Sequence, residues 1–160
     1  MSLSIEPLLE DQVRPEWVDY NGHMNDAAYA GVFSLAVERL MEMLGITAAF
    51  RDQQQYSIYT LETHLCYLGE AHEGQELCVT VQLLDHDQKR LHVFFAMEDQ
   101  DGNRLATSEQ MLMGMDMQQG RPASFPAPIE LSVKELAESQ KDEPAPENAG
   151  RIIKIHRRSK

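Results

Sequence analysis

The segment "DAAYAGVFSLAVERLMEMLG", residues 26–45, restricts the possible folds of this chain more than any other part of the sequence. Its apolar residues recur every three or four positions, which is the spacing of one face of an α-helix. A helix of about 18 residues spans roughly 27 Å, because each residue rises about 1.5 Å. An apolar stripe that long needs a broad apolar surface to pack against, and a β-sheet supplies one. The residues of the stripe are Tyr29, Val32, Phe33, Ala36, Val37, Leu40 and Leu44.

Both ends of this helix are marked by suitable residues. Asn25 or Asp26 offers a side-chain oxygen that can cap the first backbone N–H groups. Gly45 suits the position just past the last turn, where the backbone often becomes left-handed. The sequence therefore predicts one long helix that begins near Asp26 and ends near Leu44.

Four strand-like segments follow the helix, at residues 56–68, 76–86, 90–99 and 104–117. The connections between them are short, and the Asp-Gly pair in "QDGN" favours a tight hairpin. We therefore expect four antiparallel strands, each beside the next one along the chain. A further short strand is expected in "PLLEDQVR", residues 7–14. One face of this sheet would cover the helix, which is an α+β arrangement.

The first of these strands, "YSIYTLETHLCYL", alternates along its length. Successive side chains of a strand point to opposite faces of the sheet. The alternation predicts one face with Tyr59, Leu61, Leu65 and Tyr67, and an opposite face with Glu62, His64 and Cys66.

Regular structure weakens after residue 118, where three prolines interrupt the chain. The segment "IELSVKELAES" predicts a short helix, and "QKDEPAPENAG" has the composition of a mobile linker. A length of 160 residues suits one globular domain. We expect that domain to cover residues 1–130 and a partly mobile C-terminal extension to cover residues 131–160.

The charge of the chain is strongly negative and unevenly distributed. The net charge is −12, which argues against a nucleic-acid partner. The last ten residues, "RIIKIHRRSK", carry five Lys or Arg and no acid, so residues 1–150 hold 9 Lys or Arg against 26 acids and a net charge of −17. This basic tail is either a solvated end or an attractor for a phosphorylated ligand.

Neither a membrane span nor a signal peptide is expected. No run of 18 apolar residues occurs in the sequence. The opening "MSLSIEPLLEDQ" has neither the basic start nor the apolar core of a signal peptide. A cytoplasmic location without membrane contact is the resulting expectation.

A polar segment, "WVDYNGHMND" at residues 17–26, stands directly before the long helix. It places Asp19, Asn21 and His23 at alternate positions beside the helix start. Two interpretations are open. The segment is a capped turn in which Asp19 and Asn21 bind backbone groups, or it is a hydrolytic site with a carboxylate beside a helix N-terminus.

The order of these features resembles a known family. A D-x-N-G-H-x-N segment, one long helix and then antiparallel strands resemble the hotdog-fold thioesterases, above all the 4-hydroxybenzoyl-CoA thioesterase-like branch. The spacing of Asp19, Asn21 and His23 also resembles the motif of plant acyl-ACP thioesterases. The segments "VRPEWVDYNGHMN", "LETHLCYLGEAHEG" and "LATSEQMLMGMD" are similar to betainyl-CoA thioesterases of carnitine catabolism, from residue 13 to about 130. Gly114 departs from this pattern, since the resemblance leads us to expect His there.

The resemblance implies a hotdog fold, in which an antiparallel sheet wraps around one long central helix. It implies hydrolysis of a small acyl-CoA to the free acid and coenzyme A. It also implies a homodimer or homotetramer, with sheets joined edge to edge and active sites at the subunit interface. No metal or redox cofactor is implied, because coenzyme A is part of the substrate.

The family's chemistry assigns expected roles to the polar segment. Asp19 would attack the thioester carbonyl directly or act as a base towards water. Asn21 would orient the water or the carboxylate. His23 would hydrogen-bond the carbonyl or position Asp19. Backbone N–H groups at the helix start would stabilise the developing oxyanion.

Further residues are candidates for substrate binding. The cation of a betainyl group cannot donate a hydrogen bond and is held by aromatic faces and by carboxylates at a distance. Glu70 matches the position of a glutamate in the plant acyl-ACP enzymes. Each candidate also has an ordinary interpretation as a core aromatic residue or a solvated surface residue. The candidates are Trp17, Tyr20, Asn25, Tyr29, Glu62, His64, Glu70 and Glu109, with Tyr59 and Tyr67 as further aromatic faces.

Two other functions remain open on the sequence alone. Enoyl-CoA hydratases and dehydratases share the hotdog fold, although the D-x-N-x-H spacing favours hydrolysis. A non-catalytic acyl-CoA-binding module is the other alternative. The sequence has no HxxH, HExxH or GxSxG motif, which disfavours a metal hydrolase and a serine esterase.

Overall fold

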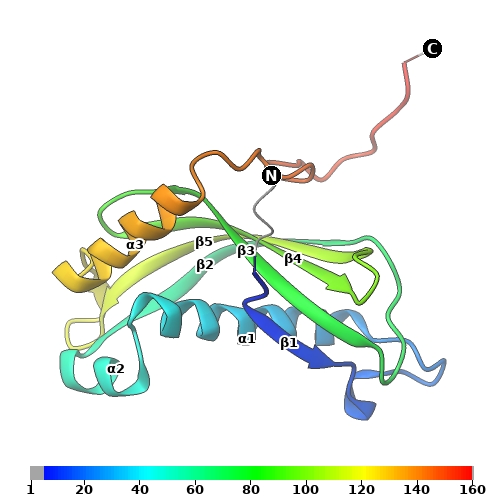
Figure 1. The fold of residues 1–160 in the computed structure, drawn as a ribbon, viewed down its shortest axis with the longest axis horizontal. Helices are drawn as coiled ribbons and strands as arrows, with labels where there is room; N and C mark the ends of the chain where they lie inside the picture. The colour runs from blue at the N-terminus through cyan, green and yellow to red at the C-terminus, as the bar shows by residue number, and fades with distance from the viewer. Residues whose placement is uncertain (1–5, 160) are drawn as a thin grey trace.

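The computed structural model describes residues 6–159, and its centre is one antiparallel sheet curled around a long helix (Figure 1). The elements in chain order are β1 (Leu9–Gln12), the 3₁₀ turn η1 (Pro15–Trp17), α1 (Asp26–Leu44), α2 (Ala48–Gln54), β2 (Tyr56–Tyr67), β3 (Glu76–His86), β4 (Arg90–Asp99), β5 (Arg104–Asp116), β6 (Arg121–Pro122) and α3 (Ala127–Ser139). The α+β class and the sheet around a central helix are as predicted. None of the helices within residues 6–159 is long and apolar enough to cross a membrane.

The central helix α1 has the predicted ends and the predicted buried face. The Asn25 side chain caps it by accepting a hydrogen bond from Ala28 N–H at 3.0 Å. Gly45 ends it in the left-handed region, with φ of 98°. Every residue of the predicted apolar stripe is buried, together with Met41. The stripe is therefore enclosed along its full length.

The order of the strands differs from the prediction at β2. The sheet runs β1-β3-β4-β5-β2, so β2 pairs with β5 at the far edge and not with β3. The connection between β2 and β3, residues 68–75, passes the start of α1, where Met24 N–H donates to Ala71 O at 2.8 Å. This crossing lets the sheet close around the helix, and a series of hairpins would not.

A β-bulge in β2 corrects the predicted alternation of that strand. The register shifts between Thr60 and Glu62, and the extra residue reverses which face the following side chains occupy. Leu65 and Tyr67 pair with core-facing residues of β5 and face α1, whereas Tyr59 pairs with Met113 on the outer face. The predicted common face for these aromatic and leucine side chains is therefore wrong. Glu62, His64 and Cys66 share one face, as predicted, and the register shows that it is the outer face of the sheet.

The C-terminal part of the chain covers both the end of the core and the outer face of the sheet. Helix α3 buries Ile129 and Val133, so it continues across the boundary expected at residue 130. Residues 140–150 then pass over the sheet face opposite α1 (Figure 1). Three side chains fasten this segment. Gln140 bonds Val81 O and Leu83 N–H, Gln82 donates to Pro144 O, and Glu109 accepts from Gly150 N–H.

Gly114 on β5 lies where no side chain fits. A Cβ atom there would be 1.9 Å from the Tyr56 hydroxyl and 2.8 Å from Ala123 O. The same hydroxyl donates a hydrogen bond to Ala123 O at 3.0 Å. The phenol ring thus occupies the space of the His expected at this position.

Candidate active site

The polar segment before α1 folds into a tight loop. Val18 and Met24 form a β-bridge at its base. Asp19 N–H donates to His23 O at 2.9 Å, and Gly22 N–H donates to Asp19 O at 2.9 Å. Gly22 has φ of 76°, which glycine adopts at little cost. The loop therefore has a fixed shape that presents its side chains to solvent.

The two carboxylate oxygens of Asp19 have different surroundings. Oδ1 accepts hydrogen bonds from Asn21 N–H at 2.8 Å and His23 N–H at 3.3 Å. Oδ2 receives no hydrogen bond from any residue between 6 and 159. One oxygen thus fixes the loop, and the other is free to react with a substrate or to accept a proton from water.

Asn21 and Tyr20 lie at the exposed tip of the loop. Tyr20 is 96% exposed, so its ring contacts almost nothing within this subunit. The Asn21 side chain makes no hydrogen bond within the described part of the chain. Both side chains are available to a bound molecule.

His23 meets the connection between β2 and β3. Its Nε2 lies 3.6 Å from Glu70 Oε2, and its ring contacts the ring of His72 edge-on, with centroids 4.8 Å apart. His23 and His72 also form a β-bridge. Glu70 is therefore placed to orient His23, as a partner that remains exposed to water.

The start of α1 offers one backbone donor. Asn25 caps Ala28 N–H, and Ala27 N–H is satisfied by the Asp26 carboxylate at 2.9 Å. Asp26 N–H has no hydrogen-bond acceptor among the described residues. This N–H group points out of the helix N-terminus next to the loop and can bind an oxyanion.

Two tyrosines surround this helix start. Tyr67 on β2 donates to Asp26 O at 3.1 Å, and Tyr29 on α1 donates to Gly69 O at 3.2 Å. Their rings meet edge-on with centroids 5.3 Å apart. Loss of solvation raises the pKa of both phenols, so both remain protonated hydrogen-bond donors at neutral pH. Tyr67 is 50% exposed and offers a free aromatic face, whereas Tyr29 is 4% exposed and belongs to the core.

Trp17 supports the loop mainly through its backbone. Its carbonyl oxygen accepts from both the backbone N–H and the side-chain amide of Asn25, each at 2.9 Å. The Arg14 guanidinium lies 4.7 Å from the centroid of the indole ring. That cation already occupies one face of the ring.

The remaining predicted residues gather elsewhere, on the outer face of the sheet. Glu62, His64 and Glu109 line a cavity of about 230 Å³ together with His92. Glu109 Oε2 lies 2.6 Å from His92 Nε2. No residue of the loop lines this cavity, so one subunit does not bring the two groups together.

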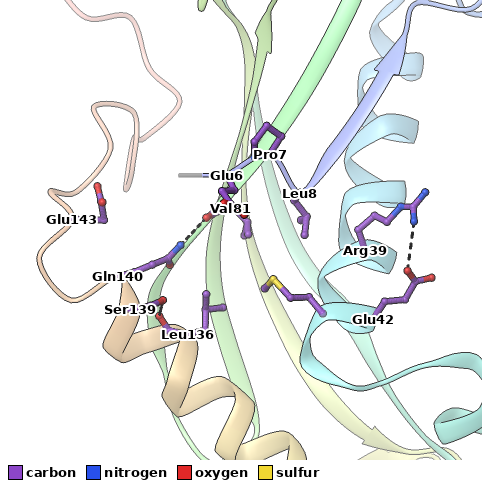
Figure 2. Close-up of a pocket in the computed structure, with 11 residues that line it drawn as sticks. Glu6, Pro7, Leu8, Arg39, Glu42, Val81, Leu136, Ser139, Gln140 and Glu143 are labelled. Carbon is purple, nitrogen blue, oxygen red and sulfur yellow. Dashed lines mark hydrogen bonds and ion pairs between the residues drawn. The ribbon is translucent and has the colours of Figure 1, made fainter. Parts of the chain in front are cut away.

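A cavity larger than this one lies at the opposite end of α1 from the loop. It has a volume of about 730 Å³ and lies between the residues just before β1, the last turns of α1, β3 and the end of α3 (Figure 2). Arg39 and Glu42 form an ion pair at its edge. None of the predicted site residues lines it.

Comparison with known proteins agrees with this fold. A family model described as the thioesterase-like superfamily matches residues 13–137. The chain therefore belongs to the thioesterase-like superfamily, its fold is the hotdog fold, and its enzyme class is thioester hydrolase.

Two curated relatives and one solved structure define the similarity further. A betainyl-CoA thioesterase of Pseudomonas aeruginosa is 45% identical over 145 residues, which cover 90% of this chain and 91% of that protein. An L-carnitine dehydrogenase/betainyl-CoA thioesterase of Rhizobium meliloti is 39% identical, over 91% of this chain and 29% of the longer protein. A Staphylococcus aureus protein solved in complex with CoA is 33% identical, with a TM-score of 0.88 over 92% of this chain and 94% of that one. The resemblance seen in the sequence is confirmed.

Proposed function

We propose that this thioesterase hydrolyses betainyl-CoA to glycine betaine and coenzyme A. The observation that carries the proposal is the 45% identity to a betainyl-CoA thioesterase over nearly the full length of both chains. The fused relative joins this activity to an L-carnitine dehydrogenase, which supports a role in carnitine catabolism. A cytoplasmic location is part of the same proposal.

Asp19 carries the reaction in this proposal. Its free Oδ2 attacks the thioester carbonyl or takes a proton from the attacking water. Asp26 N–H binds the developing oxyanion, and His23 with Glu70 hydrogen-bonds the carbonyl or the attacking water. The C–S bond breaks, the thiolate takes a proton, and water supplies the oxygen of the acid. No metal or redox cofactor takes part in the proposed reaction.

The betainyl cation would lie against exposed aromatic faces near the loop. Tyr67 and Tyr20 supply such faces, and Glu70 adds negative charge close to them. A second subunit joined along the free edge of β2 would add residues of its own β2. We propose that Glu62 and His64 act in this way, across the subunit interface.

The choice of acyl group can be tested with a neutral isostere. The 3,3-dimethylbutyryl thioester of coenzyme A keeps the shape of the betainyl group and lacks its charge. A desolvated cation on aromatic faces gains about 2 kcal/mol. We therefore expect kcat/KM to be about 30-fold lower for the isostere than for betainyl-CoA. Equal kcat/KM values for the two thioesters would show that the pocket recognises only the shape of the acyl group, and would refute the betainyl assignment.

A further inference from the structure

The basic tail, residues 151–160, differs in charge from all the rest of the chain. It holds five Lys or Arg and no acid, whereas residues 1–150 carry a net charge of −17. Residues 151–159 are all exposed. Within residues 6–159, no Lys or Arg of the tail forms an ion pair. The positive charges of Arg151, Lys154, Arg157 and Arg158 are therefore available to a ligand.

The start of the tail is fixed on the outer face of the sheet. Gly150 N–H donates to Glu109 Oε1 at 2.6 Å, and the other oxygen of this carboxylate pairs with His92 at 2.6 Å. Both oxygens of Glu109 are thus occupied. This carboxylate fastens the chain immediately before the first basic residue, Arg151.

Residues 140–150, which precede the tail, cross the strands towards the free edge of the sheet. Gln82, Phe94, Glu109 and His64 lie in one row across β3, β4, β5 and β2. The segment contacts Gln82 through Pro144 and Glu109 through Gly150. It therefore runs from β3 to β5, and the next strand in that direction is the edge strand β2.

The tail is long enough to reach the candidate active site. Tyr67, which bonds the start of α1, lies three residues along β2 from His64. That separation is about 10 Å along the strand. The tail must also pass round the end of β2, because His64 lies on the outer face of the sheet and Tyr67 faces α1. Ten extended residues span roughly 33 Å. The basic side chains can therefore reach the region beside the loop from their anchor at Glu109.

The phosphate groups of the proposed substrate favour positive charges at that place. Coenzyme A carries a diphosphate and a ribose phosphate, which a strongly negative protein repels. The loop region itself adds the carboxylates of Asp19, Asp26 and Glu70. Arg and Lys side chains bind phosphate oxygens through charge-assisted hydrogen bonds. We propose that the basic tail holds the phosphate groups of the coenzyme A moiety, an inference that rests on the proposed thioester substrate.

The test compares two thioesters that differ only in the phosphorylated part. In a full-length variant, Arg151, Lys154, Arg157, Arg158 and Lys160 are each replaced by Gln. We expect KM for betainyl-CoA to rise roughly tenfold or more, with kcat within about twofold of wild type. KM for betainyl-pantetheine, which lacks the phosphates, should be the same in both proteins. Added salt should raise KM for betainyl-CoA in the wild type and have much less effect in the variant.

The matched control removes positive charge away from the tail. Lys134→Gln with Lys141→Gln changes two exposed lysines of the α3 region that pair with Glu130 and Glu138. This control should leave the ratio of the two KM values unchanged.

Three results would overturn the proposal. The first is equal KM values for betainyl-CoA in the wild type and the tail variant. The second is an equal rise in KM for both thioesters, which would mean that the tail supports the folded protein and does not bind the phosphates. The third is binding of the wild-type protein, but not of the tail variant, to anionic phospholipid vesicles, while KM for each thioester is the same in both proteins. That result would assign the tail to a membrane surface.

Failure of the proposed function would be seen separately. If the wild type hydrolysed neither thioester, the assignment of substrate would fall. Calorimetric titration of coenzyme A into the wild type and the tail variant would then decide the role of the tail. Equal affinities would refute it, and weaker binding by the variant would support it.

Discussion

Asp19 combines a structural contact and a free reactive atom in one carboxylate. Its Oδ1 accepts the two backbone hydrogen bonds that shape the loop, and its Oδ2 has no partner in the described chain. An asparagine keeps an oxygen that can accept both backbone hydrogen bonds, but it is neither a base nor a nucleophile at neutral pH. The substitution Asp19→Asn therefore separates the capped-turn interpretation from the catalytic one.

We expect Asp19→Asn to lower kcat by roughly a hundredfold or more, with the fold unchanged. Thiol release measures the rate, and circular dichroism with urea unfolding measures the fold. Asp101→Asn, in the exposed turn between β4 and β5, is the control and should keep wild-type turnover. Near wild-type turnover in Asp19→Asn would leave the loop as a capped turn only.

The residues of the candidate site differ in how far the sequence reveals them. Asp19, Asn21 and His23 are visible because a single loop places them together within five residues. His72 and Tyr67 reach the same place through the connection that passes α1 and through β2. The spacing of His72 carries no signal until the strand order is known, and Tyr67 is visible in the sequence only as one of several candidate aromatic residues. His92, which pairs with Glu109 through strand register, is hidden for the same reason.

At the scale of the elements, the sequence predicts which strands form better than it predicts where each strand lies in the sheet. The bounds of β3 and β4 agree with the predicted segments, since alternation and turn residues are local signals. The placement of β2 beside β5 depends on closing the sheet around α1, which no local pattern encodes. The bulge after Thr60 is one extra residue, and it reverses the alternation on which the face assignment depended.

The contact of β2 with β5 at Gly114 gives a prediction for stability. Gly114→Ala would place a methyl group 1.9 Å from the Tyr56 hydroxyl and 2.8 Å from Ala123 O. Overpacking of this kind costs about 1–3 kcal/mol, so we expect the midpoint of urea unfolding to fall.

A double-mutant cycle identifies the clash. Tyr56→Phe alone should cost about 1 kcal/mol, because it removes the hydrogen bond to Ala123 O. Combined with Gly114→Ala, it should cost less than the sum of the two single changes, since the nearest clashing atom is gone. Strict additivity, or no loss in Gly114→Ala, would contradict the close approach.

At the scale of the whole molecule, the long edge of β2 is available for pairing with another copy. β2 pairs only with β5 among the strands of residues 6–159. Three large side chains on it are exposed, Tyr59 at 47%, Leu61 at 56% and Tyr67 at 50%. We propose that two copies join along this strand, as the family resemblance implies, and that each completes the other's active site.

Leu61→Lys should shift the proposed dimer towards a monomer of 18.2 kDa and lower kcat/KM at least tenfold. A lysine on an edge strand opposes pairing through its charge and hydration. Light scattering gives the mass, and thiol release gives the activity. Leu131→Lys on α3, where the leucine is 58% exposed, is the matched control. A wild-type mass of 18.2 kDa at micromolar concentration would refute the two-subunit site.

The side chain of Gln140 blocks the other border of the sheet. Its amide donates to Val81 O and accepts from Leu83 N–H, which are the two bonds that a neighbouring strand would make there. Next to it, β1 has four residues and carries Glu10 and Asp11. A sheet that could recruit copies on both borders would grow into an open filament. We therefore propose that this border, closed by a glutamine and a short acidic strand, limits growth along the sheet to two chains.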